Sequence, residues 1–288
     1  MTTNINWFPG HMARALREMK EKLSLVDLVI EVRDARAVKA STNLIMQNLF
    51  QHKPRIILLS KKDLADNNVT EQWIESWLTN PLIKVITANL LKERPGKRII
   101  TLINLLLKEK IAKQKIRGIV NWQIKVMIIG IPNVGKSRLI NTLALRKTSN
   151  VANQPGVTKG MQWVKISNDI TLLDTPGVLW PKLDQKDAAL HLSLIGAIKE
   201  QLLPIPDICY YALQFLIQNY RENLENYYDI KFKQEEDLTK EVLNQYFLTI
   251  AKIYHFKGTN DEQIALAMEK FYFTLKNGNI KNISWEKP

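Results

Sequence analysis

The sequence predicts an α/β domain with a doubly wound, mostly parallel sheet, followed by an all-α domain. Short apolar runs rich in β-branched residues alternate with helix-length segments up to about residue 145. A glycine-rich turn joins one of these runs, residues 125–129, directly to a helix. Beyond Pro181 the segments have helical length and period, and none reads as a strand. We therefore expect one domain over residues 1–182 and a second over residues 183–288.

The first part of the chain opens with a turn at Pro9-Gly10, and a helix follows it. Ser41 or Thr42 is the expected N-cap of the next helix. The charged residues Arg33-Asp34-Ala35-Arg36 follow the first strand, where an ion-paired strand end and a direct functional contact explain them about equally well. The expected helices are 12–23, 41–50, 69–78 and a basic helix over 96–115, and the expected strands are 26–32, 55–59 and 84–87.

The glycine-rich turn reads Gly130-Ile-Pro-Asn-Val-Gly135-Lys136-Ser137, which matches the phosphate-loop pattern G-x-x-x-x-G-K-[ST]. Its glycines allow successive backbone N–H groups to point at a polyphosphate. Lys136 would meet the β- and γ-phosphates, and the Ser137 hydroxyl would reach Mg²⁺. The N-terminus of the following helix would face the same anion. The expected nucleotide contacts here are Asn133, Val134, Gly135, Lys136, Ser137 and Arg138.

After this helix, a polar loop over residues 150–161 leads into a hairpin over residues 162–166 and 170–173. The second hairpin strand ends in Asp174-Thr-Pro-Gly177, a D-x-x-G element. Asp174 would hold Mg²⁺ through water, and the Gly177 N–H could sense a γ-phosphate. The phosphate loop and this element together predict a nucleotide hydrolase.

Two other strand ends carry residues that suit a guanine base. Ser60-Lys61-Lys62-Asp63 resembles N-K-x-D, in which the carboxylate accepts hydrogen bonds from guanine N1–H and N2–H₂. Adenine offers no such pair of donors. Ala88, between Thr87 and Asn89, would offer a backbone N–H to guanine O6. Each fragment is weak alone, but together they predict guanine contacts. The expected contacts are Ser60, Lys61, Asp63, Thr87 and Ala88.

The guanine elements precede the phosphate loop in the chain. In a doubly wound sheet, all loops at the carboxyl ends of the strands face one crevice, so a permuted chain can build the same site. One mechanical consequence follows from this order. The strand that ends at Asp174 leads directly into the helical domain, so a switch segment there would pull on that domain.

Helices are expected over 186–201, 206–223, 237–254 and 260–276, and Asn277-Gly278 ends the last of them. The charge is uneven between the two parts of the chain. The chain carries +13, yet residues 186–288 hold 12 basic against 14 acidic residues, and the preceding residues hold 29 against 14. Nine basic residues lie in the run 91–117. A solvated helix face usually explains such a run, but this asymmetry favours a polyanion, with nucleic acid as the first candidate.

A reducing compartment is expected because Cys209 is the single cysteine. The N-terminal residues form no apolar signal-peptide core, and no apolar run approaches the ~18 residues of a membrane span. We therefore expect a cytoplasmic protein without a membrane partner.

The motif order SKKD, TA, GIPNVGKS, PGVTKG, DTPG resembles that of the circularly permuted GTPases. The segments NWFPGHMARA, DTPGVLWPK, LSLIGAIKE and NISWEKP closely resemble the ribosome biogenesis GTPase A (YlqF/RbgA) family. The resemblance covers nearly the whole chain. It implies a permuted Ras-like phosphate-loop GTPase domain, GTP as substrate and a role in late assembly of the large ribosomal subunit. It also implies a helical C-terminal domain that contacts rRNA, and we expect a monomer released after ribosome-stimulated hydrolysis.

Individual roles follow from the same resemblance. Thr158 resembles the switch threonine that, with Ser137 and Asp174, completes the Mg²⁺ shell. Asn133 resembles the asparagine that coordinates K⁺ in related GTPases. His11, which alone would be interpreted as a surface or capping residue, matches the histidine proposed to act in hydrolysis. Val178 stands where Ras-like enzymes have a water-orienting Gln, so the basal rate should be low.

Two departures from the family pattern stand out: Ser60 replaces the Asn of N-K-x-D, and Val38 stands where a Pro is expected. The first bears on guanine affinity and the second only on loop stiffness. Two alternatives to the assembly role stay open. One is a GTPase that acts on another structured RNA or on a membrane-bound partner. The other is a nucleotide-gated RNA-binding scaffold without useful turnover.

Overall fold

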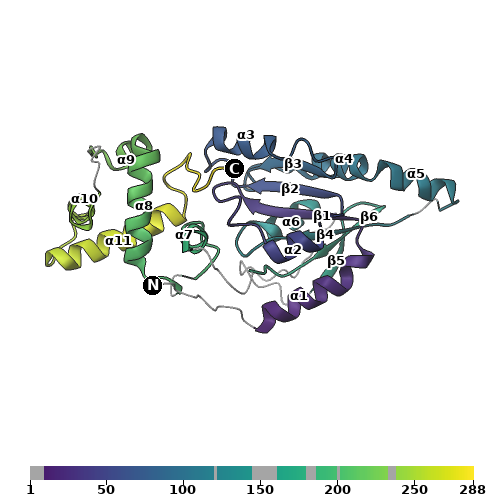
Figure 1. Ribbon diagram of the computed structural model, residues 1–288, viewed down its shortest axis with the longest axis horizontal. Coiled ribbons are helices and arrows are strands. Elements are labelled where there is room, and N and C mark those ends of the chain that lie inside the picture. Colours follow the sequence, from purple (N-terminus) through teal and green to yellow (C-terminus); the bar gives the residue numbers. More distant parts are fainter. Residues whose placement is uncertain (1–9, 120–121, 145–160, 180–185, 200–201, 233–237) are drawn as a thin grey trace.

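Six strands form one sheet in the order β3-β2-β1-β4-β6-β5 (Figure 1). The computed structural model describes residues 10–119, 122–144, 161–179, 186–199, 202–232 and 238–288. Neighbouring strands are parallel except β5, which runs antiparallel to β6 as the hairpin prediction requires. The strands are β1 (Leu28–Asp34), β2 (Arg55–Ser60), β3 (Ile83–Ala88), β4 (Ile124–Ile129), β5 (Gln162–Lys165) and β6 (Ile170–Asp174).

The register of the sheet brings the predicted site elements to one edge. Ser60 at the end of β2 lies opposite Asp34 of β1 on one side and Ala88 of β3 on the other. The phosphate loop follows β4, and the D-x-x-G element follows β6, its parallel neighbour. Strands β1 and β2 are buried at every position, as expected of parallel strands covered on both faces.

Helices cover both faces of the sheet. Ile57 and Leu59 of β2 pack with Trp73 of α3 and with Trp77, which follows that helix, and the two tryptophan rings stack 5.7 Å apart. The alternate residues of β2 belong to the main core with α4. The described helices are α1 (Gly10–Lys22), η1 (Leu23–Leu25), α2 (Leu44–Leu49), α3 (Asn67–Glu75), α4 (Gly96–Leu106), α5 (Lys108–Ile116), α6 (Lys136–Leu143), α7 (Lys186–Leu194), α8 (Ile205–Asn219), α9 (Arg221–Tyr228), α10 (Lys240–Ile253) and α11 (Asn260–Lys276).

Two helices in the sheet region differ from the prediction. The helix expected over 41–50 begins at Leu44, and its N-cap is Asn43, whose side chain accepts from the Met46 N–H. Neither Ser41 nor Thr42 caps it, because both hydroxyls donate to the Val38 carbonyl instead. The basic helix expected over 96–115 is two helices, α4 and α5, which meet at residue 107.

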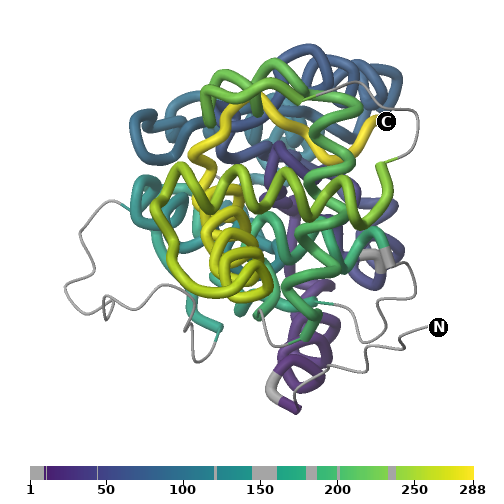
Figure 2. Tube along the Cα trace, turned by 90° about the vertical axis from the view of Figure 1, so that its left-hand side faces the viewer, coloured from purple at the N-terminus to yellow at the C-terminus, as the bar shows by residue number. Residues whose placement is uncertain are grey.

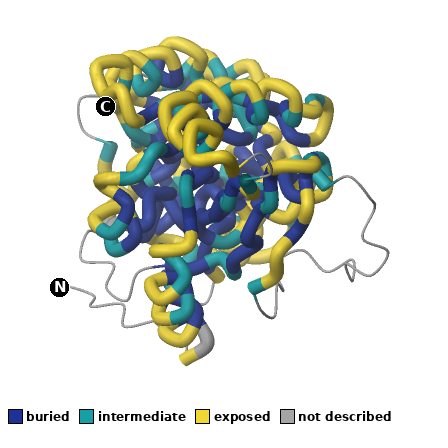
Figure 3. The backbone as a smooth tube through the Cα atoms, turned by 90° about the vertical axis from the view of Figure 1, so that its right-hand side faces the viewer, coloured by how far each residue is buried: buried dark blue, intermediate teal, exposed yellow. Residues whose placement is uncertain are grey.

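The break at Leu107 has a packing cause. Leu107 is buried, whereas α5 beyond it is described in full and buries no residue. The helix axis therefore does not need to stay against the sheet after this anchor. In Figure 1, α5 forms the end of the molecule furthest from the helices α7–α11. Figure 3 looks onto that end, where exposed turns lie nearest the viewer and buried strands lie behind them.

The helices α7–α11 lie together beside the sheet (Figures 1 and 2). The helix expected over 186–201 ends at Leu194, because Gly196 adopts the left-handed φ of 75°. The helix expected over 206–223 breaks at Tyr220, whose hydroxyl oxygen lies 3.1 Å from Oδ2 of Asp66 and 3.2 Å from the Ser284 carbonyl oxygen. The helix expected over 260–276 is confirmed, with a capping box between Thr259 and Glu262.

The C-terminal segment runs back from α11 to the sheet (Figure 1). The backbone N–H groups of Ile283 and Trp285 donate to the carbonyls of Leu64 and Arg36. The Glu286 carboxylate accepts from the N–H groups of Lys39 and Ala40. One apolar core accordingly contains both strand and helical-region residues. The domain boundary predicted after residue 182 lies outside the described residues.

In the part of the chain that the structure describes, no helix combines the length and the apolar character needed to cross a membrane.

Candidate nucleotide-binding site

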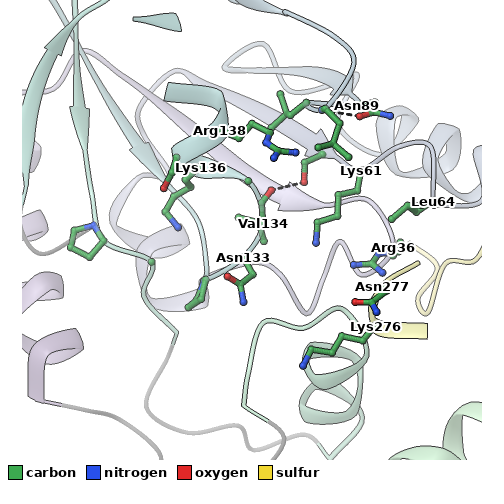
Figure 4. A pocket seen from close by; sticks show the side chains of 18 of the residues that line it. Arg36, Lys61, Leu64, Asn89, Asn133, Val134, Lys136, Arg138, Lys276 and Asn277 are labelled. Atoms are coloured by element: carbon green, nitrogen blue, oxygen red, sulfur yellow. Dashed lines mark hydrogen bonds between the residues drawn. The ribbon is translucent and has the colours of Figure 1, made fainter. Parts of the chain in front are cut away.

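A cleft of about 1320 Å³ opens where the carboxyl ends of the strands meet the helical region (Figure 4). The phosphate loop, the Ser60–Asp63 segment and the D-x-x-G element all contribute to its wall. Helix α1 and the end of α11 complete it. The nucleotide contacts predicted from the sequence that line this cleft are Ser60, Lys61, Asp63, Asn133, Val134, Gly135, Lys136, Ser137, Arg138 and Gly177.

The phosphate loop depends on glycine at both of its ends. Gly135 has a φ of 103° and forms the N-cap of α6, which places the first turn of that helix on the cleft. At Gly130, an added Cβ would lie 2.6 Å from the carbonyl oxygen of Val32, so the loop can approach β1 only with glycine there. The backbone therefore has the tight turn that a phosphate cradle requires.

Lys136 is buried at the base of the loop. Its Nζ donates to the carbonyl oxygens of Gly130 and Ile131, each at 2.9 Å. Burial lowers the pKa of Lys136 to about 8, although the nearby Asp174 carboxylate acts in the opposite direction. A Cβ added to Gly177 would lie 2.9 Å from this Nζ, so the D-x-x-G backbone rests directly against the lysine.

Asp174 ends β6 in a buried position. Its Oδ1 has no hydrogen-bond partner among the described residues. Burial raises the pKa of Asp174 to about 6, although the charge of Lys136 acts to lower it. A buried carboxylate oxygen without a partner suits a Mg²⁺ shell. Ser137 on α6 lines the cleft, whereas Asp174 precedes the cleft residues Pro176 and Gly177 in the chain and is not part of the wall. Thr158, the third predicted Mg²⁺ ligand, lies outside the described residues.

Ser60 lies under the phosphate loop. Its hydroxyl oxygen is 2.6 Å from the carbonyl oxygen of Val134 and 3.0 Å from that of Arg33 (the Val134 bond is dashed in Figure 4). A hydroxyl has one proton, and the shorter distance favours donation to Val134. The replacement of Asn by Ser therefore leaves the guanine-type motif joined to the phosphate loop.

Lys61 is held by a buried carboxylate. Its Nζ lies 2.8 Å from Oδ2 of Asp34, and the Arg36 guanidinium pairs with the same carboxylate. These two cations hold the pKa of Asp34 well below its usual range despite complete burial, which acts to raise it. The charges after β1 thus form an ion-paired strand end, one of the two interpretations that the sequence left open. Arg36 also lines the cleft.

The remaining guanine candidates occupy neighbouring positions. Asp63 is exposed on the cleft wall. Thr87 and Ala88 end β3 beside β2, but neither forms part of the cleft wall, whereas the next residue, Asn89, does. Asn89 Oδ1 accepts from the Leu91 N–H at 2.9 Å, which closes the turn after β3. The structure thus places the two guanine-type segments side by side.

Asn133 has a left-handed φ of 61°, and its side chain leaves the phosphate loop toward the helical region. Its Nδ2 donates to the carbonyl oxygen of Gly196 at 2.7 Å. Figure 4 shows Asn133 between Lys136 on one side of the cleft and Arg36, Lys276 and Asn277 on the other.

His11 lies in the first turn of α1, but its side chain is outside what the structure describes. The same helix nevertheless lines the cleft through Met12, Arg14, Ala15 and Glu18. The backbone position of His11 is therefore next to the cleft wall.

Sequence reasoning missed the cleft residues that the helical region supplies. Lys199, Lys276 and Asn277 all line the cleft, although their motifs indicated only a helix end or a surface. No local signal marks such residues, because they reach the cleft through contacts between distant parts of the chain. Arg36, which the sequence did mark as a possible functional contact, makes such long-range contacts: it donates to the Ile195 carbonyl at 3.3 Å and to the Leu275 carbonyl at 3.5 Å.

Comparison with known proteins gives consistent matches. Residues 125–245 match the family model described as a 50S ribosome-binding GTPase. The chain is 42% identical to ribosome biogenesis GTPase A of Bacillus pumilus over 226 residues, which cover 78% of this chain and 80% of the relative. It is 34% identical to the probable ribosome biogenesis GTPase A of Mycoplasma pneumoniae over 282 residues, covering 98% of this chain and 96% of the relative.

The fold is also similar to a solved structure. The GDP-bound structure of YlqF from T. maritima aligns with a TM-score of 0.65 at 27% identity, covering 94% of this chain and 99% of that one.

Proposed function

Because the chain belongs to the ribosome biogenesis GTPase A family, we propose that it is a GTP-hydrolysing assembly factor for the large ribosomal subunit. It binds the precursor particle in the GTP state and leaves after hydrolysis. One observation supports this proposal above the others. The phosphate loop, the D-x-x-G element and the guanine-type segment surround one cleft, although they come from separate parts of a permuted chain.

The cleft residues suit phosphoryl transfer to water. Lys136 places a buried cation at the phosphates, and the N–H groups at the start of α6 point the same way. Ser137, Asp174 and Thr158 would hold Mg²⁺, which when bound supplies positive charge to the β- and γ-phosphates. Asp63 accepts from the guanine edge, and Ser60 keeps its motif against the phosphate loop. At the end of β3, beside Thr87 and Ala88, Asn89 completes the base pocket.

Hydrolysis in the free protein is slow, because the side chain that follows Gly177 is apolar. Val178 is buried, and its carbonyl accepts from Asn43, so it cannot orient a water. His11, in the first turn of α1, takes that role when the protein is bound to the particle. Asn133 coordinates K⁺, which adds the positive charge that an arginine finger supplies elsewhere. Support for a role of α1 comes from its four residues on the cleft wall.

The RNA partner follows from charge and exposure. Helix α5 has no fully buried residue, packs on the core only through Ile111, and carries Lys108, Lys110, Lys113 and Lys115. Although Lys110 pairs with Asp27, the helix stays strongly basic. Most short helices are stabilised by an apolar face packed on a core, so an unburied basic helix suits a polyanionic partner such as rRNA. The protein binds the particle as a monomer.

Val178 favours one second candidate function, a nucleotide-gated RNA-binding scaffold without useful turnover. The two candidates differ in a single assay. GTP hydrolysis is measured with the protein alone, with large subunits, and with small subunits as control. A rate that rises only with large subunits supports the assembly GTPase. An unchanged rate together with GTP-dependent binding to the particle supports the scaffold.

The cleft is tested with Lys136→Ala, and Lys252→Ala serves as a matched lysine control on the exposed surface of α10. We expect Lys136→Ala to lose GTP binding and co-sedimentation with large subunits in a non-hydrolysable GTP analogue, while the control keeps both. Full GTP affinity and hydrolysis in Lys136→Ala would overturn the assignment of this cleft.

A further inference from the structure

The edge of the sheet at β5 exposes an aromatic ring. Val164 is buried on one face of the strand, whereas Trp163 and Lys165 point to the other face because they flank it in the pleat. Trp163 is 40% exposed. No other described strand pairs with the outer edge of β5. A large exposed ring on a sheet edge needs an explanation, since it contributes little to the core.

Lysines flank this tryptophan on the same face. The register aligns Lys165, Thr171 and Lys125 in one row across β5, β6 and β4. Trp163 lies in the next row, opposite Leu173. The Lys125 Nζ lies 5.8 Å from the centroid of the Trp163 ring, a cation–π distance. The face therefore presents one exposed ring with Lys125 against it and Lys165 in the neighbouring row.

The basic and aromatic character continues toward α5. The Lys110 Nζ lies 5.4 Å from the centroid of the Trp122 ring. Asp27 joins the two lysine–tryptophan pairs, because its carboxylate pairs with Lys110 and accepts from the Lys125 N–H. Both oxygens of Asp27 are thus engaged. Asp169 is exposed at the turn between β5 and β6.

We propose that the face formed by Trp163, Lys125 and Lys165 binds unpaired RNA, with one base stacked on the Trp163 ring and adjacent phosphates on the two lysines. This inference rests on the RNA partner of the proposed function and adds the site and the form of the RNA. Single-stranded sites combine a basic track with an aromatic platform for a base. Duplex RNA offers no free base face to an indole ring.

Other occupants of this face fit less well. An apolar protein partner would have to cover both lysines, whose desolvation is costly. Lysines on an edge strand also discourage pairing with a further strand or a second copy of the chain. An RNA strand satisfies the ring and the cations together, and the excess of basic residues in the first 185 residues attracts it.

The test measures binding of labelled 12-nucleotide RNA to the full chain loaded with GDP, by fluorescence anisotropy. Single-stranded RNA is compared with a hairpin duplex of matched length. Trp163→Leu keeps apolar bulk without a ring, and Trp163→Phe keeps a ring. We expect Trp163→Leu to weaken single-strand binding by about 5- to 100-fold, since stacking contributes roughly that factor per base. Trp163→Phe should retain most of the affinity, and duplex binding should barely change.

A salt series separates stacking from charge. Trp163→Leu should leave the slope of log K against log salt unchanged, whereas Lys125→Ala with Lys165→Ala should flatten it by about 0.7 for each phosphate that is no longer neutralised. Equal binding of wild-type protein and Trp163→Leu, an equal loss for duplex, or Trp163-dependent self-association in sedimentation would overturn the proposal. GDP affinity and stimulated hydrolysis of the wild-type protein are measured beside it. A wild-type protein without GDP affinity or stimulated hydrolysis would contradict the proposed function. Failure of this inference alone would change only the RNA-binding results.

Discussion

Asn133 of the phosphate loop donates its side-chain amide to the carbonyl oxygen of Gly196, at 2.7 Å. This bond joins the part of the cleft that faces the phosphates to the turn after α7. Arg36 adds a second link, because it pairs with Asp34 and donates to the carbonyl of Ile195. The helical region is thus attached to two elements that line the nucleotide cleft, so nucleotide binding and docking of that region depend on each other.

Asn133 bonds to Gly196 in the structure and is the proposed K⁺ ligand, and two substitutions separate these roles. Asn133→Asp keeps an oxygen for K⁺ but loses the donor to Gly196, whereas Asn133→Ala loses both. We expect hydrolysis to be faster in KCl than in NaCl for wild type and Asn133→Asp, and equal in the two salts for Asn133→Ala. Hydrogen exchange of residues 192–198 should be faster in both variants. The matched control is Asn219→Ala, whose side chain bonds within α8. Unchanged hydrogen exchange of residues 192–198 in both Asn133 variants would show that the bond to Gly196 does not hold this segment.

The pH dependence of nucleotide binding should have two limbs. Asp174 must lose its proton to hold Mg²⁺, and burial raises its pKa to about 6, so acid should weaken binding below that pH. Lys136 must keep its proton, and burial lowers its pKa to about 8, so base should weaken binding above it. Calorimetry of Mg²⁺–GTP binding in buffers of different ionisation enthalpy measures the proton uptake and release.

GTP itself titrates in the same range, so the acid limb needs a variant. The Asp174→Asn variant should bind Mg²⁺–GTP more weakly at every pH. It should also lose the part of the acid-induced weakening that comes from protonation of Asp174. An acid limb of unchanged size in Asp174→Asn would assign the whole limb to the nucleotide.

Base selection should depend on Asp63. In Asp63→Asn an amide replaces the carboxylate that accepts from guanine N1–H and N2–H₂, so affinity should move from guanine to xanthine nucleotides. Competition of GTP, XTP and ATP for a fluorescent nucleotide measures the change. Asp66→Asn, at the N-cap of α3, is the control for the same chemical change nearby. Wild-type protein that binds ATP as tightly as GTP would contradict the guanine assignment.

RNA binding through α5 should depend strongly on salt. Neutralising Lys108, Lys110, Lys113 and Lys115 together should flatten the slope of log K against log salt by up to about 0.7 to 0.9 for each lysine–phosphate interaction that is removed. The control removes the same number of charges from the helical region, at Lys240, Lys252, Lys257 and Lys270. If the slope changes equally in the α5 variant and in the control, the effect comes from net charge alone. If the slope of the α5 variant does not change, α5 is a solvated helix that does not contact RNA.

His11→Ala should leave GTP affinity and particle binding nearly intact and lower the subunit-stimulated rate by about 10- to 100-fold, the scale of a lost general base. The physical reason is that Val178 cannot orient water, so another group near α1 must do so. Single-turnover hydrolysis with large subunits measures the rate. His52→Ala, an exposed histidine outside the cleft, is the control. Loss of particle binding at an unchanged basal rate would instead make His11 a docking residue.

Local chemistry let the sequence by itself determine much of the fold and the centre of the site. The phosphate loop needs glycine at two backbone positions and a lysine at the start of a helix, and all of these lie within residues 130–136. The β5–β6 hairpin and the limits of α11 follow from short-range periodicity and capping, and both are confirmed. The order of motifs placed the guanine-type segments at the ends of two strands that face one crevice, and the structure shows that these strands are neighbours.

Tertiary contacts decided the rest, because they join residues that no local pattern relates. The breaks at Leu107 and Tyr220 depend on a buried anchor and on a hydroxyl that reaches Asp66, 154 residues away. The role of Ser60 became visible only where β2 passes under the phosphate loop. The cations that the helical region adds to the cleft, and the bond from Asn133 to Gly196, exist because packing brings α7 and α11 against the sheet. Sequence spacing carries no information about such contacts, since their energies arise only once the core has formed.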